Sequence, residues 1–370
     1  MKYRLVELLE CPQCRSPLTL SVKESRPVAV SSAKPFHCQL VCGRTGAAIS
    51  TQAVACEACT SIEVVSGSLA CRGCRDIFPI VGGVPWITGD LSLRREAAGT
   101  DLVAVYSHLW RNVTCKTDPG PNHLALMEST LGGGIIRGSM GLDVGSGCGA
   151  DTVAMACQYP TVELISLDLS EGVYETYRRT EGLSNVHVVR GSVLSIPLRS
   201  QVCDFGYSFG VLHHTPDPLR GLKEIVRVLK PGGCVSLYLY EDHADNPWKA
   251  IPLKAVAALR RLTVRLNSRV LSALCYVLSP FVVFAFSIPA KIMCRFKVTR
   301  AIGEQMPFNF GTSPFSVHGD LMDRFGAPIE ERYSREGVMG LLEGGELTAI
   351  RASKLKTLAG WVARGVKLDS

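Results

Sequence analysis

The fold is decided by one stretch of the sequence, Met140-Gly141-Leu142-Asp143-Val144-Gly145-Ser146-Gly147-Cys148-Gly149-Ala150. Its first half is an apolar run that predicts a buried strand, and its second half is a glycine-rich loop before a predicted helix. Glycines at such a junction let the backbone turn sharply and approach a ligand at the helix N-terminus. The stretch therefore predicts a ligand site at the end of a β-strand.

Strand-like and helix-like segments alternate on both sides of this loop. We expect strands at residues 140–144, 162–168, 186–189, 202–208 and 234–240, and helices near 150–158, 171–180 and 217–229. Lys230-Pro231-Gly232-Gly233 is expected to end the last of these helices in a turn. The alternation predicts an α/β fold, with a parallel sheet of βαβ units and helices on both faces.

Two cofactors compete for the glycine loop. Gly145, Gly147 and Ala150 satisfy the dinucleotide fingerprint, and Asp168 stands 23 residues after Gly145, where a ribose-binding acid belongs. The loop alone therefore fits NAD. Asp143, however, precedes the first glycine by two residues and lies inside the strand. An acid at this place suits a cofactor that carries an ammonium group and a sulfonium, and it suits a pyrophosphate badly.

Later blocks of the chain decide between these cofactors because they resemble class I S-adenosylmethionine-dependent methyltransferases. Ser166–Ser170 resembles their ribose-binding strand end, Val202–Pro218 their fourth strand and its loop, and Glu224–Gly233 the run before strand five. The resemblance is strongest to the group that contains the ubiquinone and menaquinone C-methyltransferases. It implies a Rossmann-like class I methyltransferase fold and an enzyme that uses S-adenosylmethionine.

The same resemblance implies which residues bind the cofactor. Asp143 and the glycines would line its methionine and sugar part, and Asp168 would accept hydrogen bonds from the ribose hydroxyls. Family members often have Asp after strand three, but Ser192 offers only a hydroxyl here, so we expect weaker acceptance from the adenine amino group. The expected cofactor-binding residues are Asp143, Gly145, Ser146, Gly147, Cys148, Gly149, Asp168, Leu169, Ser192, Val193 and Phe209.

His213 and His214 are the candidate catalytic residues. Methyl transfer mainly requires alignment of the acceptor and exclusion of water, with a general base where the acceptor must lose a proton. Both histidines follow the fourth strand, on the loop that borders the methyl group in this fold. The alternative is that one of them only caps the next helix. The Asn/Asp-Pro-Pro-Tyr motif of many nucleobase amino-methyltransferases does not occur in the sequence, which disfavours a nucleic-acid substrate.

The N-terminal region is rich in paired cysteines. Eight of the fifteen cysteines fall within the first 74 residues, and all eight come in close pairs. Two thiolates on one tight turn can bind one tetrahedral ion, so eight suffice for two structural zinc ions. The inner four would form a site nested within the outer four, although pairing of adjacent turns fits the spacing as well. The expected ligands are Cys11, Cys14, Cys38, Cys42, Cys56, Cys59, Cys71 and Cys74.

The segments that flank the outer cysteines resemble a known family. Leu8–Cys14 and Leu69–Ile87 are similar to the small zinc-ribbon proteins that partner and activate tRNA and translation-factor methyltransferases. That family core has only the outer cysteines, so residues 38–59 would be an insertion with its own metal. The resemblance implies a zinc-ribbon module at residues 1–92, fused to a methyltransferase core at residues 93–245.

Residues 246–305 form a basic and apolar insertion after the fifth strand. No residue from Val270 to Ala290 is charged, which is long enough to span a bilayer. Pro280 and Pro289 are expected to break this run into a helix pair. A lid over a greasy substrate or a membrane-surface element fits best, with a buried core and a spanning helix as alternatives.

Residues 306–370 are expected to complete the methyltransferase fold. A helix should begin near Tyr333–Val338 with Ser334 as its N-cap, followed by a closing strand pair at residues 348–352 and 360–365. No secretory signal is visible at the N-terminus, so we expect a cytoplasmic protein that is also membrane-associated if the insertion contacts lipid. The net charge of +7 permits anionic partners without demanding them.

Three functions remain open from the sequence. The leading one is a methyltransferase that acts on a small, lipophilic or biosynthetic-intermediate acceptor. The second is an RNA or protein methyltransferase whose zinc ribbon grips a macromolecule. The third is a non-enzymatic zinc-ribbon adaptor with a degenerate cofactor fold.

Overall fold

The computed structural model describes residues 1–28, 36–49, 61–88, 101–113, 123–304, 306–308, 314–355 and 359–368. Within them one sheet runs through the molecule in the order β1-β2-β3-β4-β7-β6-β5-β8-β9-β11-β10. Its strands are β1 Leu18–Pro27, β2 Ile62–Cys71, β3 Ile77–Val81, β4 Val84–Ile87, β5 Met140–Val144, β6 Glu163–Asp168, β7 Val186–Gly191, β8 Cys203–Phe209, β9 Leu229–Tyr240, β10 Leu347–Lys354 and β11 Gly360–Lys367. The predicted α/β fold is confirmed.

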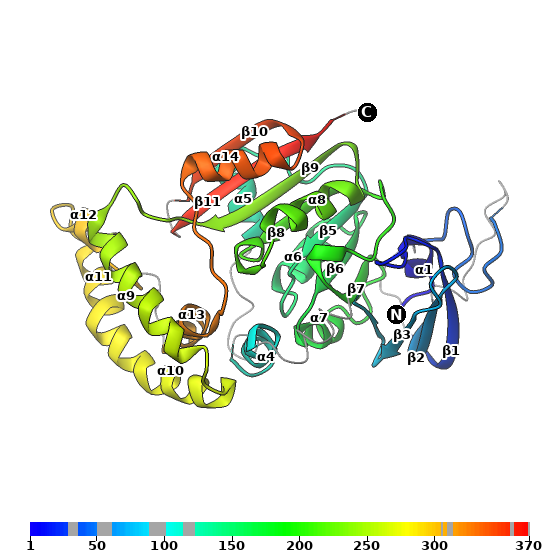
Figure 1. Cartoon of the computed structure of the whole chain (residues 1–370), viewed down its shortest axis with the longest axis horizontal. Helices are drawn as coiled ribbons and strands as arrows, with labels where there is room; N and C mark the ends of the chain where they lie inside the picture. Colours follow the sequence, from blue (N-terminus) through cyan, green and yellow to red (C-terminus); the bar gives the residue numbers. More distant parts are fainter. Residues whose placement is uncertain are drawn as a thin grey trace.

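The helices lie on both faces of this sheet and beyond one side of it (Figure 1). Those before β9 are α1 Arg4–Leu8, α4 Asp101–His108, α5 His123–Leu131, α6 Ala150–Gln158, α7 Gly172–Arg179 and α8 Pro218–Val228. Those after it are α9 Pro247–Thr263, α10 Ser268–Val282, α11 Ile288–Met293, α12 Arg300–Gly303, α13 Pro314–Gly326 and α14 Arg335–Gly344. Ser334 caps α14 as expected, because its Oγ accepts from the Gly337 N–H.

Two apolar cores show why the sheet needs cover on both sides. On one face Leu142 and Val235 pack in the same core as Ile225 of α8 and Leu342 of α14. On the other face Phe205 and Leu164 share a second core with Met127 of α5 and Met155 of α6. Strands buried on both faces read as continuous apolar runs, which is why the sequence predicts them well. β5 to β9 are parallel, and β11 joins β9 antiparallel.

The expected turn at Lys230–Gly233 is wrong. α8 ends at Val228 and β9 begins at once with Leu229, so this glycine-rich segment belongs to the strand. Cys203 pairs with Leu229 and Phe205 with Cys234, which leaves the segment as an irregularity opposite one residue of β8. Gly232 takes a left-handed φ of 70°, as a bulge permits.

The N-terminal module continues the same sheet. β1, β2, β3 and β4 form antiparallel pairs, and β4 then pairs in parallel with β7, where Trp86 lies opposite Arg190. Figure 1 shows the module at one end of the sheet. The sequence does not reveal this junction, because strand pairing between distant segments leaves no local pattern.

The insertion after β9 lies at the opposite side of the molecule (Figure 1). The predicted break of the apolar run is wrong, since Ser268–Met293 forms one continuous helix. Pro280 lies inside α10, and a π-helical turn, Val283–Ser287, precedes Pro289. Such a turn widens the backbone spiral and absorbs the hydrogen bonds that proline cannot donate. This helix is long and apolar enough to cross a membrane by length and composition.

Candidate functional site

The glycine loop lies at the carboxyl end of β5, where the order of the parallel strands reverses between β6 and β8. Crevices at such a switch point are where open α/β sheets bind ligands. Gly145, Gly147 and Gly149 take φ angles of 77°, 56° and 77°, a left-handed region that favours glycine. A Cβ at Gly145 would lie 2.1 Å from the Val211 side chain, so the loop is also sterically restricted to glycine.

Asp168 joins the end of β6 to this loop. Its Oδ2 accepts from the Gly147 N–H at 2.8 Å, and its Oδ1 accepts from the Ser170 N–H and hydroxyl at 2.7 and 2.6 Å. Burial raises the pKa of Asp168, although these hydrogen bonds oppose the shift. Each carboxylate oxygen has two lone pairs, so Asp168 retains capacity to accept from a ribose hydroxyl.

Asp143 lies within β5 and is 3% exposed. Its Oδ2 accepts from the Thr152 hydroxyl of α6 at 2.6 Å. Burial, followed by the nearby Asp151 charge, raises the pKa of Asp143 to about 7. A carboxyl group with this environment would gain from a cationic partner, which an ammonium group supplies.

The other predicted cofactor residues differ in whether their side chains already have a partner within the chain. Among the described residues the buried Ser146 Oγ has no hydrogen-bond partner, so it offers a free polar atom beside the loop. Ser192 Oγ instead accepts from the Leu194 N–H at 3.2 Å and caps a short 3-10 turn. The Phe209 ring stacks between the rings of His123 and Tyr238, with centroid distances of 4.0 and 4.1 Å. Both of its faces are therefore covered by these side chains. Three further members of the predicted set lie at the same strand ends: Cys148, Leu169 and Val193.

A π-helical turn, Leu109–Val113, packs against the glycine loop. A Cβ at Gly147 would lie 2.7 Å from the Trp110 indole, so this ring contacts the loop directly. Arg111 forms an ion pair with Glu171 at 2.5 Å, and Ser107 Oγ accepts from the Glu171 N–H at 3.0 Å. Trp110 therefore belongs to the candidate site, and no sequence pattern identifies it in advance.

His213 and His214 lie together on the turn after β8. The centroids of their rings are 4.3 Å apart, and the His213 ring packs against the Tyr240 ring with a centroid distance of 3.9 Å. His213 is fully buried, and neither of its ring nitrogens has a partner among the described residues. Burial, with the His214 and Arg332 charges, holds the pKa of His213 well below its usual value. A neutral, unpartnered imidazole beside a cofactor loop can accept a proton or a hydrogen bond from a ligand.

Asp323 of α13 meets this pair from a distant part of the chain. It accepts from the Tyr106 hydroxyl at 2.6 Å and the Tyr240 hydroxyl at 2.8 Å. His214 Nε2 lies 3.6 Å from Asp323 Oδ1, and His214 Nδ1 is 2.8 Å from the Ile329 carbonyl. Burial alone would raise the pKa of Asp323, but His214 and the two phenols hold it below its usual value. Asp323 therefore stays ionised beside the His214 ring, whose Nδ1 is held by the Ile329 carbonyl.

Four cysteines of the N-terminal module come together as a metal site. The Sγ atoms of Cys11, Cys14, Cys71 and Cys74 all lie within 4.8 Å of one another. Zn–S bonds of about 2.3 Å in a tetrahedron imply Sγ–Sγ distances of about 3.8 Å, so this set fits one zinc ion. Of the predicted inner ligands, Cys38 and Cys42 lie outside this cluster, while Cys56 and Cys59 lie outside the described residues.

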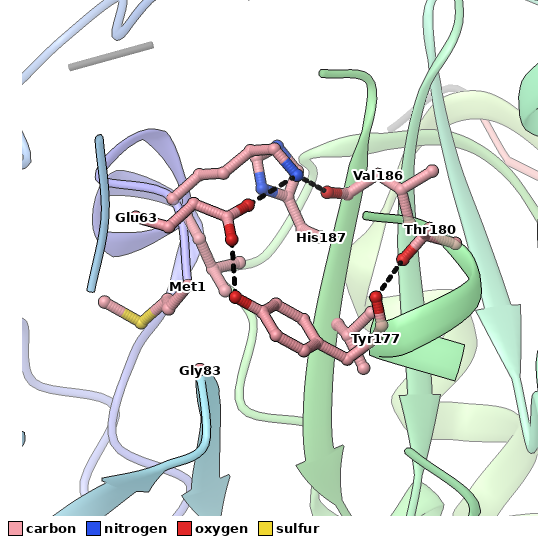
Figure 2. Close-up of a pocket in the computed structure, with 10 residues that line it drawn as sticks. Met1, Glu63, Gly83, Tyr177, Thr180, Val186 and His187 are labelled. Carbon is pink, nitrogen blue, oxygen red and sulfur yellow. Dashed lines mark hydrogen bonds and ion pairs between the residues drawn. The ribbon is translucent and has the colours of Figure 1, made fainter. Parts of the chain in front are cut away.

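Buried ion pairs fix this module against β6 and β7. Arg4 Nε donates to Glu163 Oε1 at 3.1 Å, and His187 Nε2 lies 2.7 Å from the same oxygen. Figure 2 shows Glu63 of the module beside Tyr177 of α7 at a small hollow. The Tyr177 hydroxyl donates to Glu63 Oε2 at 2.5 Å. Lys2 Nζ also donates to the Val186 carbonyl at 2.7 Å.

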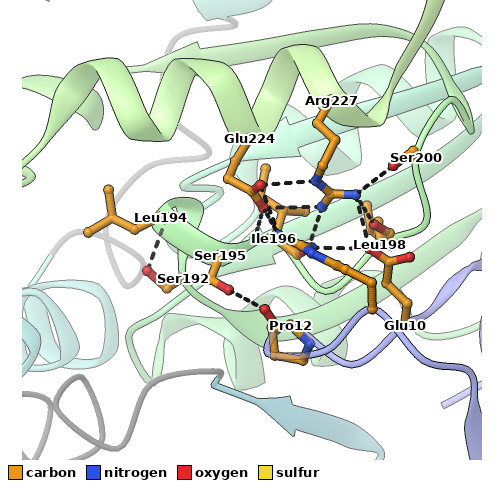
Figure 3. A network of polar contacts seen from close by, with 11 residues as sticks. Glu10, Pro12, Ser192, Leu194, Ser195, Ile196, Leu198, Ser200, Glu224 and Arg227 are labelled. Atoms are coloured by element: carbon orange, nitrogen blue, oxygen red, sulfur yellow. Dashed lines mark hydrogen bonds and ion pairs between the residues drawn. The ribbon is translucent and has the colours of Figure 1, made fainter. Parts of the chain in front are cut away.

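A second polar network reaches the cofactor side (Figure 3). Arg227 donates to Glu10 at 3.0 Å and to Glu224 at 3.0 Å, which joins the module to α8. Ser195, three residues after Ser192, donates to the Pro12 carbonyl of the zinc knuckle at 3.0 Å. The metal-binding turn thus supports the loop that follows β7.

Comparison with known proteins agrees with this geometry. Residues 142–237 match the model of the methyltransferase domain, and residues 2–83 match that of Trm112p-like protein. A demethylmenaquinone methyltransferase of Staphylococcus aureus is 38% identical over 105 residues, which are 28% of this chain and 43% of that enzyme. The chain thus spans less than half the length of the curated relatives it matches.

Solved structures with a similar overall course are distant in sequence. The pyocyanin biosynthetic protein PhzM is 17% identical, with a TM-score of 0.41 over 71% of this chain and 61% of that one. The Haloferax volcanii complex of the Trm112 methyltransferase activator with a methyltransferase is 12% identical, with a TM-score of 0.39 over 67% and 89%. The two family matches cover the two parts of the chain built above: a class I, S-adenosylmethionine-dependent methyltransferase domain, with a Trm112p-like domain fused on its N-terminal side.

Proposed function

We propose that the chain is a cytoplasmic S-adenosylmethionine-dependent methyltransferase that acts on a small lipophilic acceptor. The observation that carries this proposal is the convergence at one switch point of the glycine loop, Asp168 and the His213–His214–Asp323 cluster. S-adenosylmethionine would supply a methyl group already activated by its sulfonium. Asp143 and Asp168 would hold its ammonium and ribose groups, and Ser146 would meet it with its unpartnered hydroxyl.

The chain's own residues would then align the acceptor and take its proton. The acceptor side is walled by the rings of Tyr106, Tyr240 and His213, which suits an apolar or aromatic molecule. The Asp323 charge lies 3.6 Å from His214, and the buried neutral His213 provides an acceptor nitrogen. Trp110 would exclude water from the loop. The menaquinone methyltransferase relative supports an acceptor of this lipophilic kind.

Purified chain, incubated with labelled S-adenosylmethionine and with lipid or polar extracts, tests this proposal. We expect label in the lipid fraction, and transfer to RNA alone would contradict it. Asp323→Asn should lower kcat by about ten- to a hundred-fold, with cofactor affinity unchanged, because it removes the negative charge beside the His213–His214 pair. The same loss in Asp320→Asn, which removes an exposed carboxylate from the same helix, would show a general effect of charge on α13 instead.

A second candidate function rests on a groove between the two domains. The groove is lined by Arg15 of the zinc knuckle and by Asp217, Arg220, Lys223 and Glu224 at α8, so it carries one more cation than anions. Arg220 and Lys223 beside a Trm112p-like domain could contact the phosphates of an RNA acceptor. RNA binding that is lost in Arg220→Gln with Lys223→Gln would support this candidate over the first.

The metal content is the last part of the proposal. We propose that the outer cysteines bind one structural zinc ion and that Cys38, Cys42, Cys56 and Cys59 bind a second. Metal analysis of purified chain should give two zinc ions. Replacing Cys56 and Cys59 with Ser should reduce the count to one, and a count of one in the unmodified chain would contradict the second site.

A further inference from the structure

The charge of the helical insertion is one-sided. Residues 246–303 contain ten Lys and Arg and no Asp or Glu. The whole chain carries +7, so the +10 of this segment leaves a net −3 for the other 312 residues. Eight of the ten basic side chains are exposed: Lys254, Arg261, Arg265, Arg269, Lys291, Arg295, Lys297 and Arg300. The positive charge is concentrated in this segment, because the rest of the chain is net negative. Such a concentration favours an anionic partner.

A continuous apolar stripe runs along the same segment. Its members follow one another at intervals of three or four residues along the helix Ser268–Met293, so they share one face. Each of them is between 45% and 77% exposed. The stripe consists of Val270, Leu274, Val277, Phe281, Phe284, Ile288 and Ile292. Scattered apolar residues are normal on a protein surface, but a contiguous row of this size marks an interaction surface.

The opposite face of this helix is fixed to the protein. Leu271, Cys275 and Ser279 are at most 2% exposed, and α10 packs against α13 and α4. Leu271 and Cys275 share a core with Val105 of α4 and Leu321 of α13. The helix is therefore held in place by one face, and its apolar stripe is presented outward.

We propose that α9 to α12 dock this surface on an anionic lipid bilayer, with the long helix lying in the plane of the headgroups. Exposed arginines precede the stripe at Arg265 and Arg269, and exposed basic residues follow it at Arg295 and Lys297. Basic residues at both ends suit a helix that lies flat, because a spanning helix keeps its basic flank on one side. Phe296 and Val298, which are 61% and 92% exposed, alternate with basic residues and extend the same surface.

This inference deepens the proposed function because it names the surface from which a lipophilic acceptor would arrive. α13 carries Asp323, which faces His214, and packs against α10, whose stripe faces outward. The membrane-facing helix and the acceptor cluster are thus separated by the thickness of one helix. An acceptor dissolved in the bilayer would have a short path to the site.

Vesicle co-sedimentation of the full, zinc-loaded chain tests the inference without any cofactor. Vesicles of phosphatidylcholine are compared with vesicles that also contain phosphatidylglycerol. We expect binding to the anionic vesicles, and little to the neutral ones. Phe281→Ser with Phe284→Ser should weaken partitioning at least about ten-fold, because two exposed aromatic side chains no longer insert. Replacing Arg295, Lys297 and Arg300 with Gln should weaken it by roughly a hundred-fold, at about five-fold per charge.

Matched controls separate this surface from general stickiness and charge. Ile77→Ser removes a side chain that is 63% exposed in the N-terminal module, and it should bind as the unmodified chain does. Replacing the exposed Lys23, Arg335 and Arg351 with Gln removes the same charge elsewhere, and should change binding much less. Melting temperatures of all variants verify that each is folded.

Three results would overturn the inference: equal binding to both vesicle types, a dimer that Phe281→Ser with Phe284→Ser dissociates in the absence of vesicle binding, or retention in membranes after alkaline extraction. The second would assign the stripe to another copy of the chain, and the third to a spanning helix. Because no cofactor is present, these results are independent of whether the chain transfers methyl groups.

Discussion

The two additions to the methyltransferase domain, at opposite sides of the molecule, meet it in different ways (Figure 1). The Trm112p-like domain joins through backbone strand pairing, the buried Arg4–Glu163 ion pair and further polar contacts to the methyltransferase domain. The insertion joins through one apolar helix face and leaves the other face exposed. The first addition therefore stabilises the fold, whereas the outward face of the second contributes little to stability and is free to contact a partner.

Loss of the metal ion from the Trm112p-like domain should have the largest effect on stability. Cys71→Ser with Cys74→Ser removes half of the cluster, and structural zinc sites supply on the order of 10 kcal/mol to small modules. We expect loss of zinc, an unfolded module and weaker S-adenosylmethionine binding, because Pro12 supports Ser195. Metal analysis and calorimetry measure these effects. Unchanged cofactor affinity in the zinc-free variant would show that the knuckle does not support the loop.

Arg4→Ala should have the next largest effect. It leaves the buried Glu163 carboxylate without its guanidinium partner, and breaking a buried pair in this way costs about 3–5 kcal/mol. Arg178→Ala breaks the surface pair with Glu175 and should cost far less, because water and salt screen an exposed pair. Urea unfolding of both variants gives the two values. Equal losses would mean that the interface pair does not fix the module.

Asp143→Asn should act on the domain between the two additions. The pKa of Asp143 is raised to about 7 in the folded chain from an unfolded value of 3.8, so folding favours its proton. The stability of the unmodified chain should therefore fall as pH rises from about 4 to 7, and Asn should recover about 2–4 kcal/mol at pH 8. Unfolding at pH 4 and 8 measures this. A variant that is less stable than the unmodified chain at pH 8 would contradict it.

Phe284→Ser should have the smallest effect on stability. The side chain is 77% exposed, so the free energy of unfolding should change by less than about 0.5 kcal/mol. The matched buried change, Leu271→Ala on the opposite face, should cost about 2–5 kcal/mol. A large loss in Phe284→Ser would mean that the stripe is covered within the folded chain.

Local patterns predicted much of this fold because the parallel strands are buried on both faces. The glycine loop, Asp168 and the histidine turn follow directly from such strands, so their meeting at one edge was predictable. The contributions of Trp110, Tyr106 and Asp323 were not, since these residues come from segments on either side of the domain and share no spacing. The helix across Pro280 was predicted to break, but a π-helical turn absorbs the strain and the run stays intact.

The full, zinc-loaded chain, titrated calorimetrically with S-adenosylmethionine and separately with NAD, distinguishes the two cofactors. We expect one S-adenosylmethionine bound per chain and no NAD. Gly147→Trp should abolish binding, because φ is 56° there and the Trp110 ring occupies the space of a side chain. Gly340→Ala, in an open part of α14, should bind as the unmodified chain does. Binding of NAD, or of neither ligand, would contradict the assignment.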